Sequence, residues 1–418
     1  GQLESGAFAD ALFFGELSLN GEVRPIRGIL PMVIDAKARG AGVVFLPAEN
    51  APEAAYVEGI RVIPVATLAE VAEILKGERQ PTYAAAQPFR PDAQPGGGVD
   101  FRAIKGQAQA KRAMEIAVAG GHNILLIGSP GAGKTMLARA IPSIMPELSF
   151  EEALEITKIH SIAGELRGEP MIASRPFRSP HHSASMAALI GGGSKARPGE
   201  VSLAHGGVLF LDELAEFPTG VLQTLRQPIE RGYVRIVRVD GAFTFPSRFQ
   251  LLAASNPCPC GFLGDREVPC RCSASMVERY RSKLRGPLAD RIDMMIDVTR
   301  PDPQVIIEGA EGMSSAELRD YVVRGRAFRA WRESRMDDAD AEAEDDETRS
   351  IDGVVSTFEL DDAAEKCVLG LSKRTHLTGR GIVRLVRIAR TIADVAESEQ
   401  VTQDHVLEAA MYQGRRDQ

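Results

Sequence analysis

A glycine-rich segment in the middle of the chain has the residue types and spacing that suit phosphate binding. It follows the pattern G-x-x-x-x-G-K-T and comprises Gly128, Ser129, Pro130, Gly131, Ala132, Gly133, Lys134 and Thr135. The glycines allow main-chain N–H groups to turn toward a phosphate, and the positive end of a following helix points at the same place. Lys134 could reach the outer phosphates of a nucleoside triphosphate, and the Thr135 hydroxyl could bind Mg²⁺. An ordinary glycine-rich turn is the alternative, but the apolar run before the segment and the helical pattern after it favour a phosphate loop.

A pair of acidic residues ends a later apolar segment. The stretch HGGVLFLDEL (205–214) reads as a buried strand that finishes at Asp212 and Glu213. Asp212 could hold Mg²⁺ directly or through water, and Glu213 could orient and polarise an attacking water. The alternative is a strand that ends in solvated surface acids.

Three further polar side chains could act on the phosphates. Asn256 ends the apolar segment FQLLAASNP, where its amide could hydrogen-bond a γ-phosphate or a water. Arg291 precedes the strand-like segment RIDMMIDV, and Arg380 begins the helical pattern TGRGIVRLVRIARTIAD. A guanidinium offers several donors to a phosphate and stabilises transition-state charge. For the arginines, a solvated helix face is the alternative.

Four cysteines form a separate cluster in the sequence. Two C-x-C pairs, Cys258 with Cys260 and Cys270 with Cys272, are separated by nine residues. Together they could supply four thiolates to one tetrahedral Zn²⁺. Reduced free thiols, or a disulfide in an oxidised sample, are the alternatives.

The elements that must position these residues follow from apolar periodicity. Between residues 101 and 300, short apolar segments alternate with helical patterns, which predicts an α/β fold with a parallel sheet and helices on both faces. Polar residues that end such strands gather at one edge of the sheet. Residues 301–418 read as a helical domain, and an acidic run at about 336–349 is expected to be a disordered insert.

A small unit precedes this region. In residues 1–76, ELSLNGEVRPI predicts a hairpin, GILPMVIDAKARG a helix, GVVFLP a buried strand and PVATLAEVAEIL a turn and helix. Residues 77–100 are rich in Pro, Gly, Gln and Ala, a composition typical of a linker. The chain starts at Gly1 rather than Met, and we expect a fragment whose natural beginning is missing.

Composition restricts the class of protein. The net charge is −8, and eight carboxylates lie in the single run Asp337–Glu347, so the remainder is neutral and can still bind an anionic partner. Five cysteines in a chain of 418 residues do not resemble a secreted disulfide scaffold. No apolar run approaches the ~20 residues that span a bilayer, and no secretory signal is recognisable. We therefore expect a cytoplasmic protein without a membrane partner.

The chain as a whole resembles a known family, the ComM/YifB proteins, which are AAA+ ATPases related to the magnesium-chelatase motor subunit. The resemblance covers nearly the whole chain and rests on segments such as RPFRSPHHSASMAALIGGG, PGEVSLAHGGVLFLDELAEF, NPCPCGF, GPLADRID and VRIARTIADVA. It implies that ATP and Mg²⁺ are cofactors. It also implies a role for seven side chains: Lys134 and Thr135 in Walker A, Asp212 and Glu213 in Walker B, Asn256 as sensor 1, Arg291 as arginine finger and Arg380 as sensor 2.

The resemblance also implies an assembly and a substrate. It implies a ring, usually a hexamer, that acts on DNA as a helicase or branch-migration motor in competence and recombination. Residues 176–200 and 230–248 would be loops facing the pore, with Lys195, Arg235 and Arg238 as positive side chains. Two other functions stay open: a magnesium-chelatase-type motor subunit, and an ATP-regulated protein remodeller or scaffold.

The resemblance bears on the N-terminal unit as well. Residues 1–76 resemble part of the Lon protease domain, in an α+β unit that lacks the half expected to carry the catalytic serine. The position of the catalytic lysine falls near Leu30, so a nucleophilic dyad cannot be assembled. We expect an inactive remnant that serves assembly or partner contact.

Overall fold

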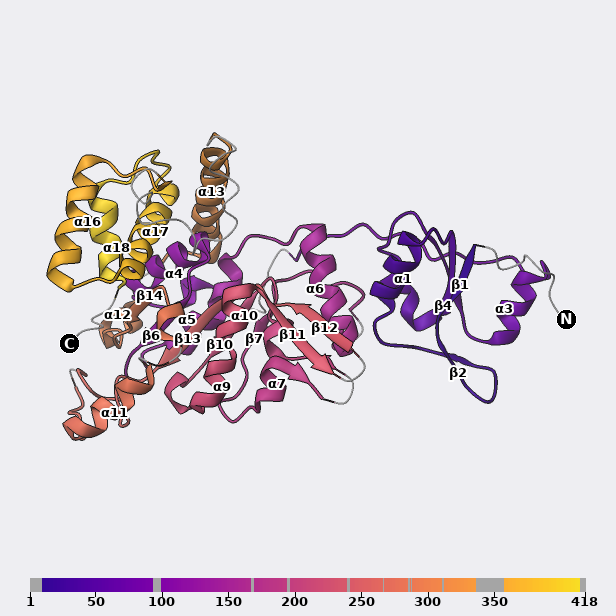
Figure 1. Cartoon of the computed structure of the whole chain (residues 1–418), viewed down its shortest axis with the longest axis horizontal. Coiled ribbons are helices and arrows are strands. Elements are labelled where there is room, and N and C mark those ends of the chain that lie inside the picture. Colours follow the sequence, from indigo (N-terminus) through magenta and orange to yellow (C-terminus); the bar gives the residue numbers. More distant parts are fainter. Residues whose placement is uncertain are drawn as a thin grey trace.

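A computed structural model of the chain describes residues 10–92, 99–166, 169–193, 196–238, 241–265, 267–284, 286, 288–309, 312–335 and 357–413. Figure 1 shows three parts in a row: a small N-terminal unit, a central α/β core and a C-terminal group of helices. The acidic insert expected at 336–349 and Lys195 lie outside the described residues. Among the described helices, none is long and apolar enough to cross a bilayer.

The N-terminal unit is built on a parallel three-stranded sheet. Its strand order is β1-β4-β5, with bounds Ala11–Phe13, Val43–Pro47 and Arg61–Val65. Its remaining elements are the hairpin strands β2 (Glu16–Leu17) and β3 (Val23–Arg24) and the helices α1 (Ile29–Ala38), α2 (Ala51–Ala54) and α3 (Leu68–Leu75). Buried side chains of α1, Ile29, Leu30 and Val33, pack with Val44 and Leu46 of the central strand.

Local signals in this unit are confirmed. The Asn20-Gly21 turn joins β2 and β3, where Glu16 pairs with Arg24. Helix α3 begins after Thr67, whose hydroxyl accepts a hydrogen bond from the Glu70 N–H. The predicted hairpin, helices and buried strand therefore form where the sequence indicates.

The core contains a five-stranded parallel sheet in the order β14-β6-β13-β10-β7. The strands are β6 (Ile124–Ile127), β7 (Phe177–Arg178), β10 (Val208–Leu211), β13 (Gln250–Ser255) and β14 (Met294–Asp297). Alternate residues face opposite layers: Leu126 and Phe210 belong to one apolar cluster, whereas Leu125 and Leu209 belong to another. The predicted parallel sheet with both faces covered is confirmed.

Helices and hairpins surround this sheet. The core helices are α4 (Ala108–Gly120), α5 (Lys134–Ala140), α6 (Phe150–Ala163), α7 (Met186–Ile190), α8 (Glu200–Leu203), α9 (Thr219–Thr224), α10 (Arg226–Arg231) and α11 (Ala274–Leu284). The hairpins pair β8 (Gly191–Gly192) with β9 (Arg197–Pro198) and β11 (Tyr233–Arg238) with β12 (Gly241–Pro246). Helix α4 contributes buried Met114, Ile116 and Val118 to the cluster that also holds Leu126.

The C-terminal group is helical, as predicted. Its helices are α12 (Pro303–Glu308), α13 (Ser315–Glu333), α16 (Asp362–Thr375), α17 (Gly379–Val395) and α18 (Gln403–Met411). Helices α13 and α17 both pack against α4, so this group shares one apolar cluster with the core.

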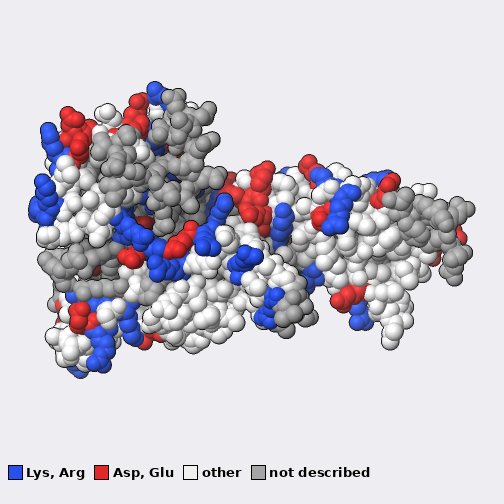
Figure 2. All heavy atoms as spheres, viewed as in Figure 1, with Lys and Arg blue, Asp and Glu red and all other residues white. Residues whose placement is uncertain are grey.

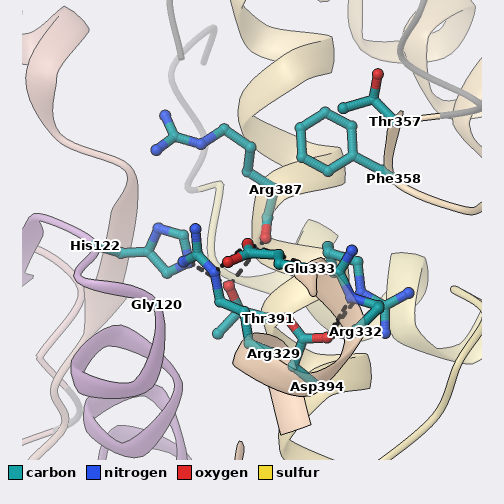
Figure 3. A pocket seen from close by; sticks show the side chains of 11 residues that line it. Gly120, His122, Arg329, Arg332, Glu333, Thr357, Phe358, Arg387, Thr391 and Asp394 are labelled. Atoms are coloured by element: carbon teal, nitrogen blue, oxygen red, sulfur yellow. Dashed lines mark hydrogen bonds and ion pairs between the residues drawn. The ribbon is translucent and has the colours of Figure 1, made fainter. Parts of the chain in front are cut away.

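A small hollow separates α13 and α17 and is lined by charged side chains (Figure 3). Arg332 and Arg390 both reach one oxygen of Asp394, at 3.2 and 3.0 Å. His122, just before β6, hydrogen-bonds Thr391 at 2.8 Å. The His122–Thr391 bond therefore ties the helical group to the segment before β6, whereas the pairs with Asp394 lie within the helical group.

Candidate nucleotide site

The phosphate loop lies between β6 and α5, and two of its glycines are required by geometry. Gly133 has φ of +93°, a backbone conformation that favours glycine, and α5 begins at the next residue. A Cβ on Gly128 would lie 2.1 Å from the Val298 carbonyl oxygen. The loop therefore approaches the main chain after β14 more closely than a side chain would allow.

Lys134 points back into this loop. Its Nζ donates to the carbonyls of Gly128 (2.7 Å) and Ser129 (3.1 Å) and to Oδ1 of Asn256 (3.2 Å). Burial lowers the pKa of Lys134, while the Asp212 and Glu213 carboxylates oppose that shift. The ammonium is therefore held by neutral oxygens at the place where a phosphate would sit.

The next side chain, Thr135, joins the phosphate loop to β10. Its hydroxyl donates to Oδ2 of Asp212 at 3.0 Å. Asp212 follows β10 and Asn256 follows β13, and these two strands are parallel neighbours. The strand ends thus bring together a hydroxyl and a carboxylate, both oxygen ligands of the kind that Mg²⁺ takes.

Glu213 lies beside a residue whose contact with it the sequence did not predict. Its backbone has φ of +53°, and its carboxylate lies 3.3 Å from Nδ1 of His182. The His182 ring also packs against the rings of His181 and Phe217. From the sequence, the histidine pair reads as structural or pore-facing. Thirty-one positions separate His182 from Glu213 in the chain, and no local signal joins them.

Arg291 lies at the amino ends of the sheet strands, opposite the carboxyl ends that carry the phosphate loop, and we call this the opposite edge of the sheet. It precedes β14, which runs parallel to β6, and its carbonyl accepts a hydrogen bond from Asn123, which precedes β6. A four-residue strand is about 13 Å long, and that length separates this edge from the phosphate loop. The Arg291 side chain is 9% exposed and forms an ion pair with Glu230 of α10.

Arg380 is also remote from Lys134. It is exposed at the start of α17. Arg384, one turn later, donates to the Asp290 carbonyl at 2.9 Å, so this end of α17 lies beside the segment that carries Arg291. Of the seven side chains, the structure therefore gathers five around the phosphate loop and puts two at the other edge of the sheet.

The four cysteines of the C-x-C pairs converge. All four sulfur atoms lie within 4.8 Å of one another. Cys258 is fully buried, and its Sγ lies 3.4 Å from that of Cys260 and 3.7 Å from that of Cys270. Main-chain groups of Arg271 and Phe262 lower the pKa of the Cys260 thiol to about 6.

Comparison with known proteins identifies the family. The family model described as magnesium chelatase, subunit ChlI, matches residues 100–306, and its C-terminal counterpart matches residues 312–413. The chain is 43% identical to an uncharacterised protein of Mycobacterium tuberculosis over 93% of this chain and 75% of that protein. It is 36% identical to the uncharacterised protein YifB of Escherichia coli (98% and 78% coverage) and 37% identical to competence protein ComM of Haemophilus influenzae (98% and 79%).

The chain belongs to the ComM/YifB family of magnesium-chelatase-related AAA+ proteins. This result confirms the resemblance read from the sequence, and the observed α/β core with its helical C-terminal group agrees with an AAA+ ATPase. The Lon resemblance has narrower support. A Lon protease of Bacillus subtilis is 43% identical over 60 residues, 14% of this chain, while residues 1–50 match a family model described as subunit ChlI of Mg-chelatase.

Proposed function

We propose that this protein is an ATP-driven ring motor that moves on DNA, as a helicase or branch-migration ATPase in competence and recombination. The observation that carries the proposal is the convergence of Lys134, Thr135, Asp212 and Asn256 at the carboxyl ends of adjacent parallel strands. This arrangement suits a nucleoside triphosphate with its metal.

Each residue then has a separable task. Lys134 leaves its loop carbonyls and Asn256 to hold the outer phosphates. Thr135 and Asp212 would hold Mg²⁺, and the bound ion would supply charge neutralisation. Glu213 orients the attacking water and accepts its proton, and Asn256 fixes the geometry of the same region.

The two remaining arginines support a ring. Arg291 and Arg380 lie at the sheet edge away from the phosphate loop of their own chain. In a closed head-to-tail ring, this edge could face the phosphate loop of the adjacent subunit. We infer a hexamer in which Arg291 and Arg380 complete a neighbour's site.

Two adjacent hairpins support a DNA partner. Arg235, Arg238 and Phe243 are exposed on the β11–β12 hairpin, and Arg197 is exposed on β9. The guanidinium of Arg238 lies beside Gly192 of the β8–β9 hairpin. The β11–β12 hairpin lies at the end of the core away from α16–α18 (Figure 1). Such arginines would contact phosphates without reading bases.

The face of the molecule drawn in Figure 2 is mixed in charge. On the face drawn in Figure 2, Lys and Arg side chains alternate with Asp and Glu over the described residues. Binding through a few hairpin arginines, rather than a broad positive surface, fits this distribution. We also propose a cytoplasmic location.

The proposal is tested by ATPase rates with and without single-stranded DNA at two salt concentrations. We expect stimulation that falls as salt rises, because phosphate contacts release counterions. The double variant Arg235→Ala/Arg238→Ala should lose stimulation but keep its basal rate. Arg39→Ala, an exposed arginine of the N-terminal unit, is the matched control, and Lys134→Ala is the inactive reference.

Two alternatives remain as outcomes of this test. The match to the magnesium-chelatase subunit favours a chelatase-type motor, which would hydrolyse ATP without a DNA response. A protein remodeller or scaffold would be stimulated by a polypeptide instead. An ATPase rate that is the same with and without DNA at both salt concentrations would contradict the proposal of a DNA motor.

A further inference from the structure

The loop 258–272, which carries the four clustered cysteines, has the geometry of a metal site. A tetrahedral metal with metal–sulfur distances of about 2.3 Å places its sulfurs about 3.8 Å apart. Three sulfur pairs in the loop are separated by 3.4, 3.6 and 3.7 Å. A disulfide needs about 2.05 Å, and all four cysteines are free. Four thiolates in a tetrahedron favour zinc over harder cations.

The same loop covers the phosphate loop. A Cβ on Gly261 would lie 2.7 Å from the Pro130 ring, so this glycine allows the main chain of the cysteine loop to pack directly against that ring. The Glu267 N–H and the Ser129 side chain lower the pKa of the Asp265 carboxyl, which places Asp265 beside Ser129. The cysteine loop therefore touches the phosphate loop at two successive residues.

Arg300, just after β14, stabilises the contact between the cysteine loop and the phosphate loop. Its guanidinium donates to the Pro130 carbonyl at 3.2 Å and lies 3.6 Å from the Asp265 carboxylate. It also lies over the ring of Phe262. The Asp265 side chain is 4% exposed and the Arg300 side chain is 34% exposed, so the carboxylate end of this contact is shielded from solvent.

We propose that Cys258, Cys260, Cys270 and Cys272 bind one Zn²⁺, and that the zinc-bound loop braces the phosphate loop and so sets its affinity for ATP. Without the metal, nothing holds the four cysteine sulfurs close together, and loop 258–272 loses its fixed conformation. Ser129 and Pro130 then lose the surface against which they rest. The coupling to ATP rests on the proposed nucleotide site, whereas the zinc site does not.

Metal content tests the first half. We expect about one zinc per chain by mass spectrometry of the full chain purified without chelator. Cys272→Ser should lose this zinc, and Cys367→Ser, a half-buried cysteine of α16, should keep it. Zinc-free wild-type protein after purification with added zinc, or iron in place of zinc, would overturn the site.

Nucleotide affinity tests the second half. Removing zinc from the wild-type chain with a chelator should raise the dissociation constant of a fluorescent ATP analogue about tenfold, the effect of one lost charge-assisted hydrogen bond. Restoring Zn²⁺ should reverse the change. An unchanged dissociation constant would overturn the coupling.

A variant distinguishes the effect of the contact with the phosphate loop from the effect of metal binding. Arg300→Ala should keep its zinc and still bind the analogue several-fold more weakly, whereas Arg39→Ala should match wild type. Zinc retention with wild-type affinity in Arg300→Ala would contradict the bracing role. If the zinc-loaded wild-type chain binds no analogue, the proposed nucleotide site fails and the coupling fails with it, while metal content still decides the zinc site.

Discussion

At the scale of single residues, the polar groups of the candidate site are paired with one another. Lys134 donates to two carbonyls and to Asn256, and Thr135 donates to Asp212. Each partner is a neutral group or a carboxylate that a phosphate or Mg²⁺ could replace. Binding would therefore exchange bonds from the Lys134 ammonium to neutral oxygens for bonds to a phosphate, in which both partners are ionised.

The contact between His182 and Glu213 gives a prediction about rate. It occupies a carboxylate oxygen that would otherwise polarise water, so we expect His182→Ala to raise basal hydrolysis. The increase should be about two- to fivefold, the range of an exposed ion pair, because the Glu213 side chain is 56% exposed. Steady-state ATPase measurements with a parallel ATP-binding titration check both rate and affinity.

The neighbouring histidine provides the control. The Nδ1 atom of His181 lies 2.8 Å from the Ser183 hydroxyl, on its own turn. His181→Ala should therefore leave the basal rate near wild type. A fall in rate for His182→Ala at unchanged affinity would show that this contact orients Glu213 productively.

At the scale of elements, the N-terminal unit is held to the core between α1, α2 and α6. Glu53 of α2 accepts hydrogen bonds from the Leu30 N–H and from the Ser161 hydroxyl of α6. Burial raises the pKa of Glu53 above its ordinary value of 4.5, and the two hydrogen bonds oppose that shift. The junction therefore favours the protonated carboxyl.

This junction predicts a pH-dependent stability effect. Because the folded state raises the pKa of Glu53, its favourable contribution is present below pH 4.5 and is lost as pH rises through the folded pKa. Glu53→Gln keeps the accepting oxygen and removes the ionisation. It should stabilise the chain by about 1 kcal/mol at pH 8 and have little effect near pH 4.

Thermal unfolding of the variant and wild type at the two pH values measures this difference. Glu49→Gln, an exposed position in the turn before α2, is the control and should change little at either pH. The same stabilisation of Glu53→Gln at both pH values would contradict the ionisation argument.

Elements with local signals could be predicted, and contacts between distant segments could not. The phosphate loop, the strand ending at Asp212 and the Asn20-Gly21 hairpin depend on neighbouring residues, so the sequence predicts them. Strand β7 has two residues, too few for a period to be recognised. The pairing of Glu213 with His182 and the contact of Gly261 with Pro130 arise only from tertiary packing.

At the scale of the whole molecule, the proposed ring predicts that two inactive variants can rescue each other. Arg291→Ala should keep ATP binding and lose hydrolysis by about 10³-fold or more, as for an arginine finger. Lys134→Ala should lose its own site but still offer Arg291 to a neighbour. ATPase assays of the two variants mixed in equal amounts should therefore recover part of the wild-type rate.

The pairing of Arg291 with Glu230 requires a control for folding. Removing the arginine leaves Glu230 without one partner, so unfolding temperature should be recorded for each variant. No recovery from a mixture of folded, co-assembling variants would contradict action between subunits. Full activity of a single unassembled chain would contradict the ring itself.

The ion pair between Arg291 and Glu230 has a mechanical consequence under this proposal. Glu230 lies in the last turn of α10, and the β11–β12 hairpin starts three residues after it. When Arg291 contacts the nucleotide of the adjacent subunit, its ion pair with Glu230 breaks. The start of the β11–β12 hairpin in the same subunit then loses a stabilising contact. The grip of each subunit on a DNA strand would then depend on the ATP bound at the neighbouring subunit, so that the subunits release the strand one after another.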